Sequence, residues 1–286
     1  METTTLAVFA VFAAASFAVL QRVDGEVREP YMDEIFHVPQ AQRYCKGAFG
    51  EWDPKLTTPP GLYVASLVLR AWGACTLQRL RLVNWALGLG LFWTIFGLIR
   101  RLHSARPAHA AACALTFSLL PTAFFFNHLY YTDTASLLCV LLAYLLSVRA
   151  QHAAASMVGF ASLWMRQTNV VWVALIGATA VERWLRARGI VQADSVSQLV
   201  VQLCRWAQNP RGWRECTRML APYALVVLVF VAFVVANGGI VLGDKAHHQA
   251  GIHVPQMLYF YAFMCAMAAP TVLGEARNHV HAIANR

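Results

Sequence analysis

Residues 28–61 read REPYMDEIFHVPQAQRYCKGAFGEWDPKLTTPPG. This stretch follows an apolar run closely and combines many charged side chains with His37, whereas the chain elsewhere avoids charge. Of all 286 residues, 58% are hydrophobic and 13% are charged, compared with about 45–50% and about 25% in soluble domains. The composition therefore predicts a helical membrane protein, with residues 28–61 in a polar loop outside the bilayer core.

Uncharged apolar runs occur on both sides of this loop. Because a charge at mid-bilayer is costly, the absence of Asp, Glu, Lys and Arg from them is typical of membrane spans. We expect an all-α polytopic membrane protein in which residues 1–286 form one transmembrane domain of about eight helices. The runs cover residues 4–20, 82–99, 109–127, 134–148, 154–165, 170–181, 221–236 and 257–273.

The run at residues 4–20 is also consistent with a cleaved signal peptide. Against that interpretation, no basic segment precedes it, and the Gln21-Arg22-Val23-Asp24 sequence that follows is not a small-residue cleavage site. We therefore expect an uncleaved first span.

Arginine-rich loops set the expected orientation. Residues 182–220 hold seven Arg and no Lys, and the positive-inside rule places them in the cytosol. Counting back from this loop puts residues 21–81 on the far side of the membrane only if residues 61–78, which carry Arg70, do not cross. We therefore expect residues 61–78 to form an interfacial or re-entrant helix within the first loop. The remaining segments are five spans in 82–181, single spans at 221–236 and 257–273, a far-side loop at 237–256 and a cytosolic tail at 274–286.

The far-side loops then contain most of the carboxylates of the chain. Asp33 and Glu34 are adjacent, and such a pair can supply a general base if burial or a partner tunes one of them. His37 lies within reach of both if residues 31–37 are helical. Flat aromatic rings pack on sugar C–H groups, while polar side chains bind hydroxyls. A sugar site is therefore one interpretation of the neighbouring residues. The other interpretation is an aromatic belt at the bilayer interface, with Asp33 as a helix cap. These neighbours are Tyr31, His37, Gln40, Arg43, Tyr44, Trp52 and Asp53.

Two short motifs join apolar runs on the same side. HLYYTD (128–133) contains Tyr131 and Asp133, and RQTN (166–169) begins with Arg166. Asp133 is expected to act either as a helix cap or as a ligand for a hydroxyl group. Arg166 is expected either to bind an anion or to snorkel towards the interface.

In the loop at 237–256, Lys245 and His247 are candidates for a phosphate-binding patch, and a solvated loop is the alternative. No histidine spacing favours a metal site, so we expect neither a metal nor a cofactor. Cys45 and Cys75 share one far-side segment and are able to pair. The net charge of +9 is dispersed over loops, which is typical of membrane topology rather than of nucleic-acid binding.

Four motifs together carry a family resemblance. They are REPYMDEIFHVPQAQRYC with WDPKLTTPPGLY (28–45 and 52–63), FFFNHLYYTD (124–133), MRQTN (165–169) and VVANGGIVLGDKAHHQAGIHVPQ (234–256). They resemble, in the same order, motifs of the eukaryotic dolichyl-phosphate-glucose-dependent α-1,2-glucosyltransferases. The resemblance implies a GT-C-like bundle in the endoplasmic reticulum membrane, with a large first luminal loop that carries the catalytic carboxylate and serves N-linked glycosylation.

The resemblance also implies the reaction partners. The donor is dolichyl phosphate glucose, the acceptor is a diglucosylated dolichyl-diphosphate-linked oligosaccharide, and both lie in the lipid bilayer. An α-linked product from a β-linked donor requires inversion, and therefore one in-line attack and one base. We expect Asp33 to be this base, with Glu34 as second candidate, and Arg166, Lys245 and His247 to bind the donor phosphate.

Members of this family are longer, with further spans and a further luminal segment, so we expect the chain to be C-terminally shortened. An inactive shortened form or a membrane scaffold subunit is therefore an alternative function. A polyprenyl-lipid or solute transporter is another, although transporters usually place ionisable groups within their spans.

Overall fold

The computed structural model describes residues 3–73, 75–190, 198, 201, 210–245, 251 and 253–284. Within these ranges every regular element is a helix, which confirms the predicted all-α class. The chain divides into two units, Met1–Lys245 and Ala246–Arg286.

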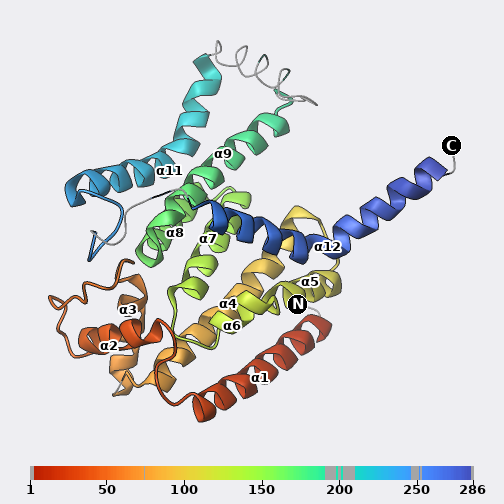
Figure 1. The fold of residues 1–286 in the computed structure, drawn as a ribbon. Helices are drawn as coiled ribbons and strands as arrows, with labels where there is room; N and C mark the ends of the chain where they lie inside the picture. The colour runs from red at the N-terminus through yellow and green to blue at the C-terminus, as the bar shows by residue number, and fades with distance from the viewer. Residues whose placement is uncertain are drawn as a thin grey trace. The chain divides into compact units, whose positions relative to one another are not determined.

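The first unit combines longer bundle helices with short helices in its loops (Figure 1). The longer helices are α1 (Thr3–Glu26), α4 (Leu77–Leu102), α5 (Pro107–Ser118), α7 (Thr132–Val148), α8 (His152–Met165), α9 (Val170–Ala187) and α11 (Pro210–Asn237). The short ones are α2 (Glu34–Cys45), α3 (Gly61–Ala65), η1 (Ser66–Trp72), α6 (Pro121–Phe126) and η2 (Gln167–Asn169). Helix α4 packs against α1, α5 and α7, whereas α8 packs against α7 and α11.

Helix length and composition fit a membrane protein. Among the described residues, three helices are long and apolar enough to cross a membrane: Thr3–Glu26, Leu77–Leu102 and Trp213–Asn237. The shorter apolar helices Gly61–Trp72, Thr132–Val148 and Val254–Ala269 fall below the ~20 residues of a perpendicular crossing. The expected total of about eight spans stays a prediction.

Two predicted segments are interrupted in the structure. The run at 109–127 is divided, since α5 ends at Ser118 and α6 begins at Pro121. Proline donates no backbone hydrogen bond and disfavours a helical conformation in the residue before it, so the helix ends there. Segment 61–78 is also discontinuous, because η1 ends at Trp72 and Gly73 adopts a φ of 87°. Its assignment to the first luminal loop stays a prediction.

A cluster of buried side chains supports the first polar loop. Tyr63 of α3, Leu80 of α4 and Tyr130, which precedes α7, are fully buried in one core with residues of α2. A disulfide between Cys45 and Cys75 ties the end of α2 to the segment before α4. The structure thus confirms the predicted cysteine pair, and the first loop is anchored to the bundle at both ends.

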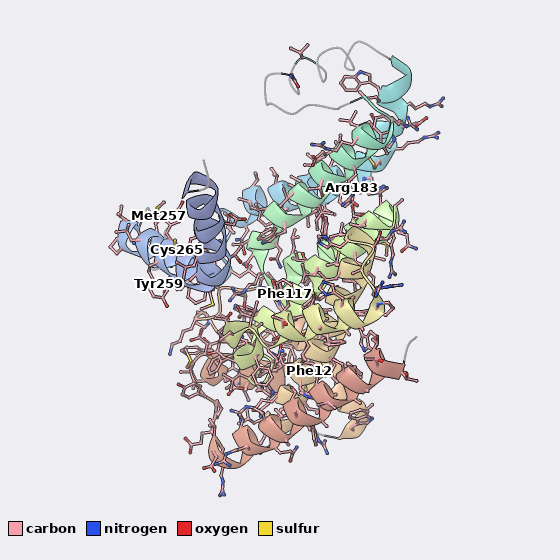
Figure 2. All side chains as sticks on the ribbon, turned by 90° about the vertical axis from the view of Figure 1, so that its right-hand side faces the viewer. Phe12, Phe117, Arg183, Met257, Tyr259 and Cys265 are labelled. Atoms are coloured by element: carbon pink, nitrogen blue, oxygen red, sulfur yellow. A yellow bond between two sulfur atoms is a disulfide. The ribbon has the colours of Figure 1, made fainter. Side chains whose placement is uncertain are left out.

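The second unit contains α12 (Val254–Ala284), which includes the predicted run at 257–273. Figure 2 labels Met257, Tyr259 and Cys265 on this helix, and all three side chains are exposed. Of the predicted basic loop at 182–220, the structure describes residues 182–190, 198, 201 and 210–220, which include the end of α9 and the start of α11.

Candidate active site

The polar motifs meet at one end of the bundle, where α4 begins and α8 ends (Figure 1). The carbonyl of Thr57 accepts hydrogen bonds from Nε2 of Gln167 (2.7 Å) and from the backbone N–H of Leu242 (3.2 Å). The N–H of Asp244 donates to the carbonyl of Pro54 (2.8 Å). Three of the motifs therefore share hydrogen bonds, although they are far apart in sequence.

Gly243 makes the close approach of two of these motifs possible. Its φ is +72°, and a Cβ atom at this position would lie 2.3 Å from the carbonyl oxygen of Pro54. Only glycine fits both the left-handed backbone and the contact.

Asp33 presents an exposed carboxylate at the start of α2. It stands at the N-cap position, but its side chain makes no capping hydrogen bond, so the predicted cap is not formed. Its backbone N–H donates to the hydroxyl oxygen of Tyr131 (2.6 Å). Within the described ranges the Asp33 carboxylate forms no ion pair, which leaves both of its oxygens open to a substrate.

Glu34 is fully buried and occupied by internal partners. Its oxygens accept two hydrogen bonds from Arg81, at 2.9 and 2.6 Å. They also accept the backbone N–H groups of Tyr130 (2.6 Å) and Tyr31 (3.0 Å). A carboxylate offers about four acceptor positions, so Glu34 has none left for a substrate hydroxyl. The geometry therefore separates the two adjacent carboxylates: Glu34 is engaged by the fold, whereas the carboxylate of Asp33 is exposed.

His37 is a buried, neutral member of the same group. A hydrogen bond of 2.6 Å joins its Nδ1 to the hydroxyl of Tyr63, and its ring centre lies 5.8 Å from that of Tyr131. Burial lowers the pKa of His37 to about 4; the negative charge of Asp33 opposes the shift and the positive charge of Arg166 adds to it. His37 is thus uncharged at neutral pH and lies within electrostatic reach of both charges.

Arg166 forms an ion pair with Asp133, which lies two residues after Tyr131. The backbone of Arg166 is extended between α8 and η2, and its Nη2 lies 3.2 Å from Oδ2 of Asp133. Its Nε donates to Oγ1 of Thr132 (3.2 Å). The Arg166 side chain is 43% exposed. A guanidinium group has five N–H donors, and several of them remain available for an anion.

A cavity of 430 Å³ opens beside this ion pair, between α4, α6, α7 and α9. Its polar lining comes from Asn127, Asp133, Arg166 and Asn169, and its apolar lining includes Leu91, Phe126, Leu137, Val140 and Trp172. The cavity thus combines a charged region with an apolar slot.

Several predicted sugar-binding residues instead shape the first loop. Gln40 is buried; its Nε2 donates to the carbonyl of Glu51 (2.7 Å), and its Oε1 accepts the N–H of Asp53 (3.0 Å). Arg43 lies 3.8 Å from the Glu51 carboxylate. These contacts hold residues 51–53 on α2.

The aromatic residues of that set also pack internally. Tyr44 is buried with its ring against those of Phe49 and Tyr63. Nε1 of Trp52 donates to the carbonyl of Leu56 (3.3 Å). Tyr31, by contrast, is 48% exposed and lies two residues before Asp33. Sugar binding by this set stays a prediction.

The predicted phosphate ligands of the 237–256 loop are only partly described. Nζ of Lys245 donates to the carbonyl of Asn237 and lies 3.3 Å from the Asn237 side-chain oxygen. His247 lies outside the described residues. Among the residues that the structure describes, no group of three or more His, Cys, Asp or Glu is placed to hold a metal ion, and the metal prediction stays open.

Sequence reasoning missed two residues of α4 that hold the site together. Arg81 binds Glu34 from 47 positions away, and Nδ2 of Asn84 donates to the carbonyls of Leu129 and Tyr131, both at 2.7 Å. The available signal was weak: one Arg and one Asn near the start of an apolar run. Such residues are often paired inside the bundle.

The chain is similar to known proteins over most of its length. A family model described as the DIE2/ALG10 family matches residues 27–286. A mouse protein is 37% identical over 278 residues, covering 86% of this chain and 59% of its own length. A Drosophila melanogaster protein is 38% identical over 280 residues (93% and 62%), and a human protein is 34% identical over 284 residues (88% and 59%).

All three relatives carry the name Dol-P-Glc:Glc(2)Man(9)GlcNAc(2)-PP-Dol alpha-1,2-glucosyltransferase. The chain spans about three fifths of the length of these curated relatives. No solved structure matches it.

Proposed function

The chain belongs to the DIE2/ALG10 family, and on this premise we propose that it takes part in inverting glucosyl transfer. The donor is dolichyl phosphate glucose and the acceptor is the diglucosylated dolichyl-diphosphate oligosaccharide, joined in α-1,2 linkage. The names of the relatives support this donor, acceptor and linkage. The predicted topology, which places the polar loops on one side of the apolar runs, supports a luminal site in the endoplasmic reticulum membrane.

The observation that carries the proposal is the open carboxylate of Asp33. The backbone of Asp33 binds Tyr131, which lies two residues before Asp133 of the Arg166 cavity. Asp33 accepts the proton of the acceptor hydroxyl while that oxygen attacks the anomeric carbon of the donor glucose. The bond between this carbon and the phosphate oxygen breaks on the opposite face, so the configuration inverts. One base is sufficient for this step, because phosphate leaves without protonation.

Arg166 offers the charge that a departing phosphate requires. Negative charge develops on the phosphate oxygens in the transition state, and preorganised N–H donors are an efficient way to stabilise it. The apolar wall of the adjacent cavity, with Leu91, Phe126 and Val140, provides space for the first isoprene units of the donor. Donor head and donor chain are thus bound by neighbouring parts of one cavity.

Two other functions remain as alternatives, and one experiment separates all three. Membranes that contain the full gene product are incubated with dolichyl phosphate [¹⁴C]glucose and the diglucosylated lipid-linked acceptor. Labelled glucose in the oligosaccharide, in α-1,2 linkage, is the expected result. A scaffold subunit would give label only when a separate transferase is added. A transporter would move the labelled donor across sealed vesicles without transfer, and either outcome would contradict the proposal.

A further inference from the structure

A buried network of charges includes Glu34, the residue that follows Asp33. At its centre is Arg81 of α4, whose side chain is 0% exposed. It makes two parallel hydrogen bonds with Glu34, from Nε to Oε1 (2.9 Å) and from Nη2 to Oε2 (2.6 Å). Its Nη1 donates to Oδ1 of Asp24 (3.1 Å). The network therefore joins the end of α1, the start of α2 and the first turns of α4.

The carboxylate of Glu34 extends this network into the backbone on both sides of the site. One oxygen accepts the N–H of Tyr31, two residues before Asp33 (3.0 Å). The other accepts the N–H of Tyr130, one residue before Tyr131 (2.6 Å). Asp33 and Tyr131 are themselves joined by a hydrogen bond of 2.6 Å. One buried side chain thus fixes both partners of this contact.

The backbone between these anchors is strained. Met32, the residue before Asp33, has a φ of +53°, which is uncommon for a residue with a side chain. A residue keeps such a conformation only when its surroundings enforce it. The bond between Glu34 and the N–H of Tyr31 closes the turn around Met32, and the carboxylate of Asp33 is directed outward from that turn.

The link to α1 adds a second level of support. Nη1 of Arg81 also donates to the carbonyl of Val27 (2.8 Å), and Nη2 approaches the carbonyl of Glu29 (3.4 Å). Residues 27–29 connect α1 to the turn that precedes Asp33. A lysine at position 81 would keep the positive charge but would lose the planar fork that reaches Glu34, Asp24 and both carbonyls together.

We propose that Asp24, Arg81 and Glu34 are positioning residues, which hold the Asp33 carboxylate and the Tyr131 hydroxyl in the geometry needed for transfer without touching the substrates. The proposal rests on the proposed function for its catalytic consequence. Its structural part, the fixing of residues 31–33 against residues 130–131, is independent of that function.

The decisive experiment measures kcat and donor KM for Asp24→Asn, Arg81→Lys and Glu34→Gln in the full gene product. A displacement of about 1 Å at a reacting group can lower the rate about 10²-fold. We expect a decrease of that size in kcat for Arg81→Lys and Glu34→Gln, a smaller one for Asp24→Asn, and a nearly unchanged donor KM. The matched control is Glu26→Gln, which breaks the exposed Arg22–Glu26 pair on the same α1 helix and should keep wild-type kcat.

Folding is monitored in each variant by the Cys45–Cys75 disulfide, and activity is expressed per folded molecule. Hydrogen–deuterium exchange of peptides covering residues 28–36 and 127–133 gives a readout that needs no activity. We expect faster exchange than in the wild type in both peptides for Asp24→Asn and Arg81→Lys. Glu26→Gln should leave the exchange rates of both peptides unchanged. If Arg81→Lys does not fold, the kcat and exchange rates of Asp24→Asn test the proposal.

Wild-type kcat per folded molecule in these variants would overturn the proposal, as would unchanged exchange in both peptides. A wild-type protein without glucosyl transfer would instead contradict the proposed function. The exchange measurement would still decide whether the network holds the two segments together.

Discussion

The backbone N–H of Asp33 donates a hydrogen bond of 2.6 Å to the hydroxyl oxygen of Tyr131. This bond joins the first loop to the segment that enters α7, across 98 positions of sequence. It leaves the Asp33 carboxylate exposed while fixing the backbone that carries it. The contact explains how an exposed residue on a polar loop can keep a defined position.

The first prediction concerns the Asp33 carboxylate itself. Asp33→Asn keeps the size of the side chain but removes its ability to accept a proton, and loss of a general base costs about 10²–10⁴-fold in rate. We expect a decrease of that order in kcat with unchanged thermal unfolding, because the side chain makes no internal contact that the substitution breaks. Glucosyl transfer in detergent, compared with Glu26→Gln as a control, measures it. Turnover equal to wild type would remove Asp33 from the mechanism.

The second prediction concerns the partner of that bond. Tyr131→Phe removes the hydroxyl acceptor and leaves the ring in place. A typical hydrogen bond contributes about 0.5–1.5 kcal/mol, so we expect kcat to fall about tenfold, since tenfold corresponds to about 1.4 kcal/mol. Tyr144→Phe, at the Arg183 contact on α7, is the control. Equal effects of the two substitutions would argue against a specific role for Tyr131.

The third prediction concerns the pH dependence of stability through His37. Burial lowers its pKa to about 4 in the folded protein, below the value of about 6.5 for an unfolded chain. The unfolded state therefore binds the proton first as the pH falls. The stability that depends on neutral His37 is complete above about pH 6.5, decreases as the pH falls towards 4, and then levels off.

Thermal unfolding of the wild type and of His37→Gln between pH 7.5 and pH 4 tests this expectation. Glutamine can keep a hydrogen bond to Tyr63 but does not titrate, so the variant should lose less stability across this range. Parallel pH profiles for the two proteins would show that His37 does not contribute to the dependence.

The fourth prediction concerns the disulfide that anchors the first loop. Cys45 and Cys75 are 30 positions apart, and closing a loop of this size stabilises a protein by about 3–4 kcal/mol in the chain-entropy account. We expect the double variant Cys45→Ala, Cys75→Ala to have a lower unfolding temperature and reduced glucosyl transfer. The reason is that the loop between the two positions is then no longer closed by a covalent bond. Cys265→Ala, an exposed free cysteine, should leave both unchanged. A double variant with wild-type unfolding temperature would contradict the anchoring role.

Sequence patterns predicted some of these features because their causes are local. Most apolar runs without charge lie within helices, and the shared segment of Cys45 and Cys75 allowed the pairing that the structure contains. The different fates of Asp33 and Glu34 were not predictable in this way. They are neighbours in sequence, and only the approach of Arg81 from α4 buries one and leaves the other exposed.

The internal contacts of several predicted sugar-binding residues were also not predictable from the sequence. The composition around Trp52 indicated a binding surface, but composition does not reveal which side chains are engaged in internal hydrogen bonds and packing. Gln40 uses its amide to hold residues 51 and 53, and Tyr44 packs against Tyr63. Those contacts depend on how the loop folds back on α2. The break before Pro121 was not predicted, although a proline within an apolar run could have indicated it.

The last prediction separates the two parts of the Arg166 cavity. Arg166→Lys keeps a positive charge but removes the fork that holds Asp133 and Thr132, so donor phosphate would be less well stabilised in the transition state. We expect kcat to fall by about 10²-fold, as is typical when one such donor is lost. Val140→Trp places a large ring in the apolar part of the cavity and should raise donor KM while changing kcat less.

A donor with a shortened isoprenoid chain provides the internal control for this difference. If the apolar slot binds the chain, Val140→Trp should lose its effect on KM with a short-chain donor, whereas Arg166→Lys should remain impaired with both donors. The reverse result, in which chain length matters for Arg166→Lys but not for Val140→Trp, would place the hydrocarbon chain elsewhere. The phosphate and the chain would then not share the cavity between α4 and α7.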